Sequence, residues 1–131
     1  MNISDIAQIA ANILYLDEDE QIVASGSLFQ DYNMSWLDFV DFACELQAAA
    51  NLEFTPDQLW PINAMMGQAA FYRGGAWTDA GHAELARLFD GYAAPVPSGS
   101  AQELQNLFSV AWVAHRLRVL REGARTPEPL A

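Results

Sequence analysis

Hydrophobic residues recur at helical spacing along most of the chain, with polar residues between them. The clearest stripe lies near the N-terminus, where Ile, Ala and Leu residues three or four positions apart predict a helix over residues 3–16. A second helix is predicted over residues 36–50, with Ser35 as its N-cap. We expect the inward face of this second helix to consist of apolar residues: Leu37, Val40, Cys44 and Leu46.

Signals that start or break helices predict the elements that follow. Thr55 precedes Pro56 and Gln58, the pattern of an N-cap, a first helical residue and a capping box, so a short helix is expected there. We expect the later helices to cover three ranges: 62–72, 79–90 and 101–121. The glycines after Arg73 separate the first two of these, and the Pro- and Ser-containing stretch 93–100 separates the last two.

The chain is therefore predicted to be all-α, because no run of residues shows the alternation of a strand. Thr78 and Ser100 are N-cap candidates for the last two helices, and Ser100 with Glu103 has the pattern of a capping box. A long loop should cover residues 17–35, held to the core by four apolar side chains: Ile22, Val23, Leu28 and Phe29. We expect a single domain over residues 1–122 and a flexible tail over residues 123–131.

Charge is distributed unevenly along the chain, whose net charge is −11. Residues 1–60 contain eleven Asp and Glu and no Arg, whereas residues 61–131 contain six of each sign. Asp38, Asp41 and Glu45 are spaced so that they share one face of the second helix. Nucleic acid is not an expected partner, because phosphate binding requires a cationic surface, and a basic protein surface is the natural complement.

The sequence also indicates a cytoplasmic protein without a transmembrane segment. There is no run of about 18 apolar residues, and the first residues lack the basic start and apolar stretch of a signal peptide. Cys44 is the single cysteine, so no disulfide can form within the chain.

The first 60 residues resemble the acyl carrier proteins. The resemblance rests on Leu28, Phe29 and Asp31, on the Leu37-Asp38 and Val40-Asp41 pairs, and on the Leu46 and Leu52-x-Phe54 positions. It implies a four-helix bundle whose acidic second helix docks onto basic patches of biosynthetic enzymes. The last predicted helix would then be the family's fourth helix. Residues 61–92 would be a helical insertion between the third and fourth family helices.

The chain departs from this family at the attachment site. The family motif is Asp-Ser-Leu, whose Ser bears 4′-phosphopantetheine, and the aligned residues here are Ser35-Trp36-Leu37. An indole has no hydroxyl that could form the phosphodiester. Either Ser35 is the attachment site, or the chain is a pseudo-carrier without the arm. In a pseudo-carrier, Trp36 would be either an interface anchor or a packing residue against Phe39 or the preceding loop.

The favoured interpretation is a protein without catalytic activity that docks onto partner enzymes and scaffolds or activates them. The docking residues would be Trp36, Asp38, Asp41 and Glu45. The alternative is a functional acyl or aminoacyl carrier with 4′-phosphopantetheine on Ser35. No metal site is expected, since His82 and His115 lie in separate helices without a ligand-type spacing.

Cys44 and the arginines of the last helix are further candidates for a functional role. Cys44 is expected to be a buried packing residue rather than a nucleophile, because no base lies near it in the sequence. Arg116, Arg118 and Arg121 cluster on the last helix. Favourable placement of charge at the C-terminal end of that helix explains them more simply than a second interaction surface does.

Overall fold

The computed structural model describes residues 1–17, 19–90, 92 and 101–125. In these ranges the chain forms helices and one short hairpin, in the order α1 (Ile3–Ile13), α2 (Trp36–Ala50), α3 (Pro56–Leu59), α4 (Ile62–Met66), β1 (Tyr72–Arg73), β2 (Ala76–Trp77), α5 (Asp79–Leu88), α6 (Ala101–Gln105) and α7 (Val110–Arg125). The helical class predicted from the sequence is thus confirmed, with a small hairpin that the pattern did not predict. Among the described residues, no helix has the length and hydrophobicity needed to cross a membrane.

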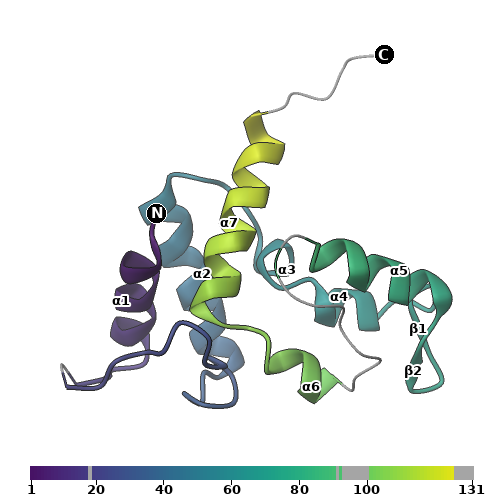
Figure 1. The fold of residues 1–131 in the computed structure, drawn as a ribbon, viewed down its shortest axis with the longest axis horizontal. Helices are drawn as coiled ribbons and strands as arrows, with labels where there is room; N and C mark the ends of the chain where they lie inside the picture. Colours follow the sequence, from purple (N-terminus) through teal and green to yellow (C-terminus); the bar gives the residue numbers. More distant parts are fainter. Residues whose placement is uncertain (18, 91, 93–100, 126–131) are drawn as a thin grey trace.

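Helices from the first half of the chain and the last helix, α7, form the main packing unit. Helix α1 packs against α2 and α7, and α3 packs against both α2 and α7. Figure 1 shows α7 between α1 on one side and the α4–α5 segment on the other. Helix α1 ends at Ile13, three residues earlier than expected, because Tyr15 adopts a left-handed backbone conformation with φ of 55°.

Helix α2 has the predicted bounds but a different inward face. Its buried residues are Phe39, Phe42, Ala43, Leu46 and Ala50. Leu37 is 77% exposed and Cys44 is also exposed, so the prediction that both face inward is wrong. The helix is apolar around most of its circumference, and the two phenylalanines have more surface to bury than Leu37 and Cys44 do.

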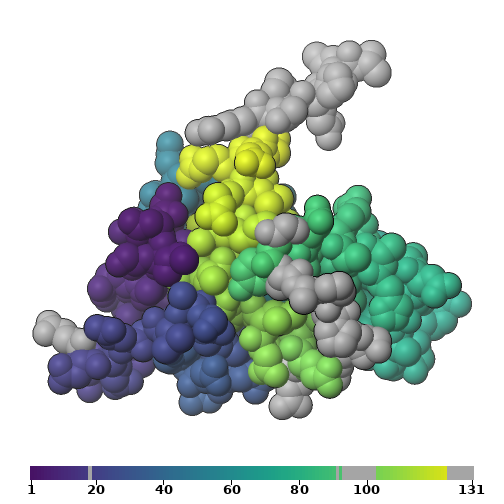
Figure 2. Space-filling view, in the orientation of Figure 1, coloured from purple at the N-terminus to yellow at the C-terminus, as the bar shows by residue number. Residues whose placement is uncertain are grey.

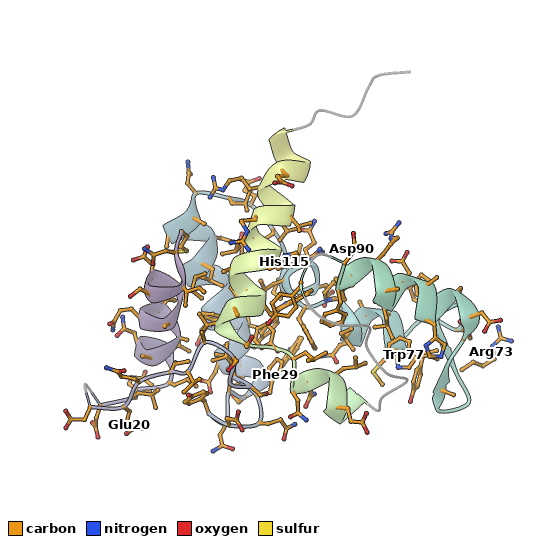
Figure 3. All side chains as sticks on the ribbon, viewed as in Figure 1. Glu20, Phe29, Arg73, Trp77, Asp90 and His115 are labelled. Carbon is orange, nitrogen blue, oxygen red and sulfur yellow. The ribbon has the colours of Figure 1, made fainter. Side chains whose placement is uncertain are left out.

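Aromatic side chains form the centre of the core. Their rings make a connected series in which Phe39 contacts Phe108 at 5.4 Å, Phe108 contacts Trp60 at 5.2 Å, and Trp60 contacts Trp112 at 5.8 Å between centroids. Phe29, from the loop before α2, stacks on Phe108 at 4.6 Å and is labelled in Figure 3. The loop is therefore held as predicted by Phe29 and also by buried Leu28, although Val23 is 60% exposed and does not contribute.

The helix predicted over residues 101–121 is interrupted between α6 and α7. Ser109 is buried, and its hydroxyl accepts a hydrogen bond from the Trp112 N–H at 3.1 Å, which makes it the N-cap of a new helix. The carbonyl of Phe108 accepts a hydrogen bond from the Leu28 N–H at 2.8 Å. The Ala111 N–H donates to the carbonyl of Ala24 at 3.0 Å. The backbone at the break between α6 and α7 is therefore hydrogen-bonded to the long loop before α2. The proposed Ser100 cap and the 93–100 linker lie outside the described residues.

Residues 61–90 form a lobe beside this unit, which we call the α4–α5 lobe (Figure 2). The helix expected over 62–72 stops at Met66, and the hairpin pairs Tyr72 with Trp77. Gly74 and Gly75 have φ of 62° and 80°, the left-handed geometry of a two-residue hairpin turn.

Helix α5 is fixed to this hairpin by its first turn. The Thr78 hydroxyl caps the helix by accepting from the Gly81 N–H at 3.1 Å, as its position in the sequence predicted. A Cβ on Gly81 would lie 2.1 Å from the carbonyl oxygen of Phe71, so only glycine fits there. The glycine in the first turn of α5 therefore has a structural explanation.

Candidate docking surface on helix α2

The start of α2 is closed by a reciprocal pair of hydrogen bonds. The Ser35 hydroxyl accepts from the Asp38 N–H, and the Asp38 carboxylate accepts from the Ser35 N–H, both at 3.1 Å. This is a capping box, which satisfies backbone donors that the first turn of a helix leaves without partners. Ser35 therefore acts as the N-cap, as predicted, and the Asp38 carboxylate is held at the positive end of the helix.

Trp36 follows the cap residue, and its side chain is partly exposed. Its ring stacks on the buried ring of Phe39, with centroids 4.8 Å apart and planes 27° apart. It nevertheless remains 46% exposed. The packing contact that the sequence suggested is present, and the outer part of the indole is still available to a partner.

Several exposed or partly exposed residues of α2 are apolar or acidic, and together we call them the α2 face: Trp36, Leu37, Asp38, Asp41 and Glu45. Leu37, Asp41 and Glu45 are four residues apart and all exposed, so they form one row along the helix. Within the described part of the chain, neither Asp41 nor Glu45 forms a hydrogen bond or an ion pair. The row therefore presents one exposed apolar side chain and two carboxylates without partners among the described residues, and Trp36 is a second exposed apolar side chain near the start of the helix.

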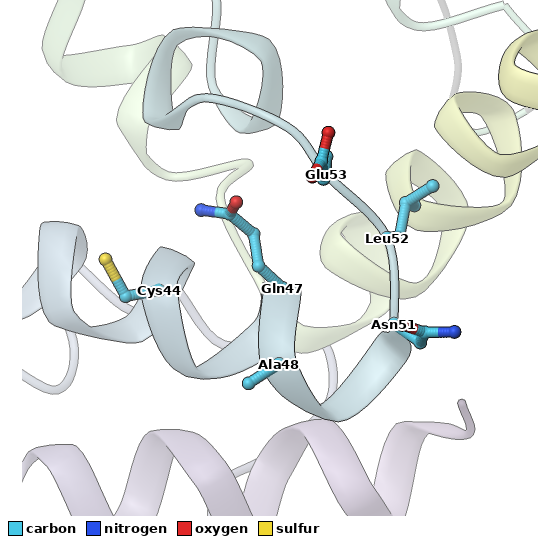
Figure 4. A pocket seen from close by; sticks show the side chains of 6 residues that line it. All are labelled: Cys44, Gln47, Ala48, Asn51, Leu52 and Glu53. Carbon is cyan, nitrogen blue, oxygen red and sulfur yellow. The ribbon is translucent and has the colours of Figure 1, made fainter.

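Cys44 lies beside this row and lines a shallow groove of about 380 Å³ at the C-terminal end of α2 (Figure 4). The other lining residues are Gln47, Ala48, Asn51, Leu52 and Glu53. No His, Lys or Arg is among these described residues, so the groove places no base or cation beside the thiol. Cys44 is exposed, so the prediction that it is a buried packing residue is wrong.

Two of the clustered arginines bind backbone carbonyls of other helices. Arg121 donates to the carbonyl of Ala50, the last residue of α2, at 2.6 Å. The Arg116 Nε donates to the carbonyl of Gln58 in α3 at 2.7 Å. Helix C-termini leave carbonyls without partners, and cations are favourable there. These arginines therefore stabilise the C-terminal ends of neighbouring helices, whereas the sequence suggested a role at the end of their own helix.

His115 lies where α7 meets the end of the α4–α5 lobe, near Asp90 (Figure 3). Its ring packs against Tyr92 and Trp112, with centroids 5.3 and 5.8 Å apart. Burial lowers the pKa of His115 below its ordinary value, and the neighbouring positive charges of Arg118 and Arg116 lower it further, with an opposing effect from Asp90. The ring is a packing residue that favours the neutral form.

Helical spacing places Asp38, Asp41 and Glu45 together on one side of α2. Trp36 lies on another side of the helix, roughly 140–200° around the axis, where it stacks on buried Phe39. No group of His, Cys, Asp and Glu within the described residues has the arrangement needed to hold a metal ion. The exposure of Leu37 was missed because an apolar residue on an apolar helix gives no signal of its orientation. Comparisons with protein-family models, with curated proteins and with solved structures found no match, so the function must be argued from these residues.

Proposed function

We propose that this chain is an acyl-carrier-like docking protein that holds no 4′-phosphopantetheine and binds biosynthetic enzymes through the α2 face. The observation that carries the proposal is the exposed row of Leu37, Asp41 and Glu45, whose carboxylates have no partner among the described residues. Trp36 is also exposed at the start of the helix, about 100° around the helix axis from Leu37.

The order and packing of the helices support the resemblance to carrier proteins. Helix α1, a long loop, α2 and the short α3 follow one another as in that family, and α7 packs against both α1 and α3 as a closing fourth helix would. The α4–α5 lobe corresponds to the insertion expected over residues 61–92. A carrier-like bundle with this lobe added is the architecture we propose.

The start of α2 supports the absence of the pantetheine arm. Trp36 stands at the position aligned with the family's modified serine, and its ring is stacked on Phe39. The Ser35 hydroxyl already has a structural role in the capping box. Ser35 is exposed, however, and a carrier with its arm on this residue is the competing function that the second experiment below addresses.

The α2 face has the composition expected of a docking surface. Unpaired carboxylates on a protein of net charge −11 would accelerate encounter with a basic partner, an effect that salt should weaken. Trp36 and Leu37 can supply the apolar contacts that hold the complex, because buried aromatic and aliphatic anchors contribute most to affinity at interfaces. The protein would then scaffold or activate its partner without catalysing a reaction itself.

The first experiment measures binding of the chain to an immobilised carrier-modifying enzyme with a basic docking patch, a broad-specificity phosphopantetheinyl transferase. Replacing Asp41 and Glu45 by Lys should abolish measurable binding, because attraction becomes repulsion. The matched control replaces Asp17 and Asp19 by Lys, which changes the net charge by the same amount in the exposed loop before α2. Equal losses in both double variants would reject the α2 face as the docking site.

The second experiment decides between the two functions by intact-mass spectrometry after incubation with coenzyme A and the same transferase. We expect no added phosphopantetheine on the wild-type chain, while a known carrier in the same reaction is modified. A mass gain that disappears in Ser35→Ala would replace the proposal by the carrier function. The double variant Ser35→Asp and Trp36→Ser restores the family motif and should accept the arm if the bundle is carrier-like.

A further inference from the structure

A second concave surface lies on the other side of α7, between α4, α5 and α7. It has a volume of about 430 Å³, within the usual range of small-molecule sites. None of its lining residues comes from α2, so it is separate from the docking surface. We call it the lobe groove, since the α4–α5 lobe supplies two of its walls.

The walls of the lobe groove are partly apolar. Met65 on α4 is buried, and Leu88 on α5 is half-buried against the core. Val119 on α7 is 40% exposed and lies at the edge. A ligand that covers these side chains would remove apolar surface from water, which favours binding.

The lobe groove also contains an excess of positive charge. Arg87 pairs with Glu84 at 3.2 Å, and both line the groove. Arg116 also lines it, and among the described residues it donates to the backbone carbonyl of Gln58 rather than to a carboxylate. Two guanidinium groups therefore face one carboxylate in a protein that is otherwise strongly acidic.

Arg116 is suited to bind an anion because it is both held and partly desolvated. The hydrogen bond from Nε to Gln58 fixes the side chain and leaves its terminal nitrogens as donors. Burial lowers the pKa of Arg116, and among the described residues no carboxylate offsets this effect. A partly buried cation without a counter-charge gains from an anionic ligand, and guanidinium groups match carboxylates in geometry.

We propose that the lobe groove binds a small amphipathic monocarboxylate, with its carboxylate on Arg116 and its hydrocarbon part over Met65, Leu88 and Val119. Charge complementarity selects the anionic head, and the apolar walls select the chain. This proposal does not depend on docking by α2, and it gives the α4–α5 lobe a role of its own.

The test is a titration of the ¹⁵N-labelled wild-type chain with sodium octanoate, followed by amide chemical shifts. We expect saturable shifts around Leu88 and Val119, with a dissociation constant on the order of 1 mM for so small a ligand. Octylamine and octanol have the same chain without the carboxylate and should bind at least about tenfold more weakly. Equal binding of all three, or octanoate shifts confined to other parts of the chain, would overturn the proposal.

Substitutions at the edge of the groove separate binding from folding. Val119→Glu places a like charge beside the carboxylate and should weaken octanoate binding about tenfold, whereas Val119→Arg should strengthen it. Val23→Glu is the matched control, because Val23 is also an exposed valine and does not line the groove. Unchanged affinity in both Val119 variants contradicts the proposal. The α2 charge-reversal variant should bind octanoate like the wild type, so each proposal can fail without the other.

Discussion

Charged residues have different surroundings in the two halves of the molecule. On α2, Asp41 and Glu45 point outward without partners among the described residues. On α7, Arg116 and Arg121 donate to carbonyls at the ends of α3 and α2. The acidic charges are therefore available for recognition, whereas the basic charges contribute to the fold. Sequence position alone does not reveal this, since both sets look like solvated helix faces.

The largest effect is expected from removal of an arginine that binds a backbone carbonyl. Arg121→Met keeps the aliphatic part of the side chain but loses the hydrogen bond to Ala50, and should lower the free energy of unfolding by about 1–2 kcal/mol. Arg118→Met is the control, because Arg118 is exposed on the same helix. Urea denaturation followed by circular dichroism measures both. Equal stability of the two variants would contradict the claim that the arginines of α7, unlike the acids of α2, contribute to the fold.

The next effect concerns the cap of α2. Ser35→Ala removes the acceptor for the Asp38 N–H and should cost about 1 kcal/mol, measured by the same denaturation. Ser35→Asp supplies another capping oxygen and should retain most of the stability. The pair also separates the cap from any attachment role, because neither variant has a hydroxyl. A loss of stability in Ser35→Asp as large as in Ser35→Ala would argue against capping as the role of this residue.

A smaller effect is expected from the titration of His115. Because its pKa is lowered in the folded state, the unfolded chain binds this proton more readily. Stability is therefore lost as the pH falls below 6.5, the ordinary value, and the loss levels off below the lowered folded pKa. His115→Gln should flatten the stability curve in this window. If the free energy of unfolding of His115→Gln fell with decreasing pH as steeply as that of the wild type, His115 would not be the source of this pH dependence.

The smallest change in stability is expected on the α2 face itself. Asp41→Asn and Glu45→Gln together should alter the free energy of unfolding by no more than about 0.5 kcal/mol, because neither side chain has a partner among the described residues. The same double variant should weaken binding to a basic enzyme and reduce its salt dependence. A large loss of stability would mean that these acids contribute to the fold after all.

Features with a local physical cause could be predicted from the sequence. Ser35, Thr55 and Thr78 cap the helices that they were expected to start, because a hydroxyl needs only the next turn of backbone to act as a cap. The bounds of α2 were also predicted correctly. The row of acids on one face followed from helical periodicity alone.

Features that depend on distant residues could not be predicted in this way. The inward face of α2 is set by contacts such as that of Phe39 with Phe108, which lie far apart in the sequence. The break before α7 is supported by hydrogen bonds to the loop around Leu28. A hydroxyl at Ser109 could have suggested a helix start, but the surrounding pattern continued without interruption. The partners of Arg116 and Arg121 likewise required the tertiary structure.

The position of Trp36 gives the molecule a built-in optical reporter. The chain has four tryptophans, and the other three are at most 8% exposed. Long-wavelength emission and quenching by a water-soluble agent should therefore arise mainly from the indole at the start of α2. Occupation of this helix by another protein should shield that emission and shift it to shorter wavelength, so docking can be followed in unlabelled wild-type protein.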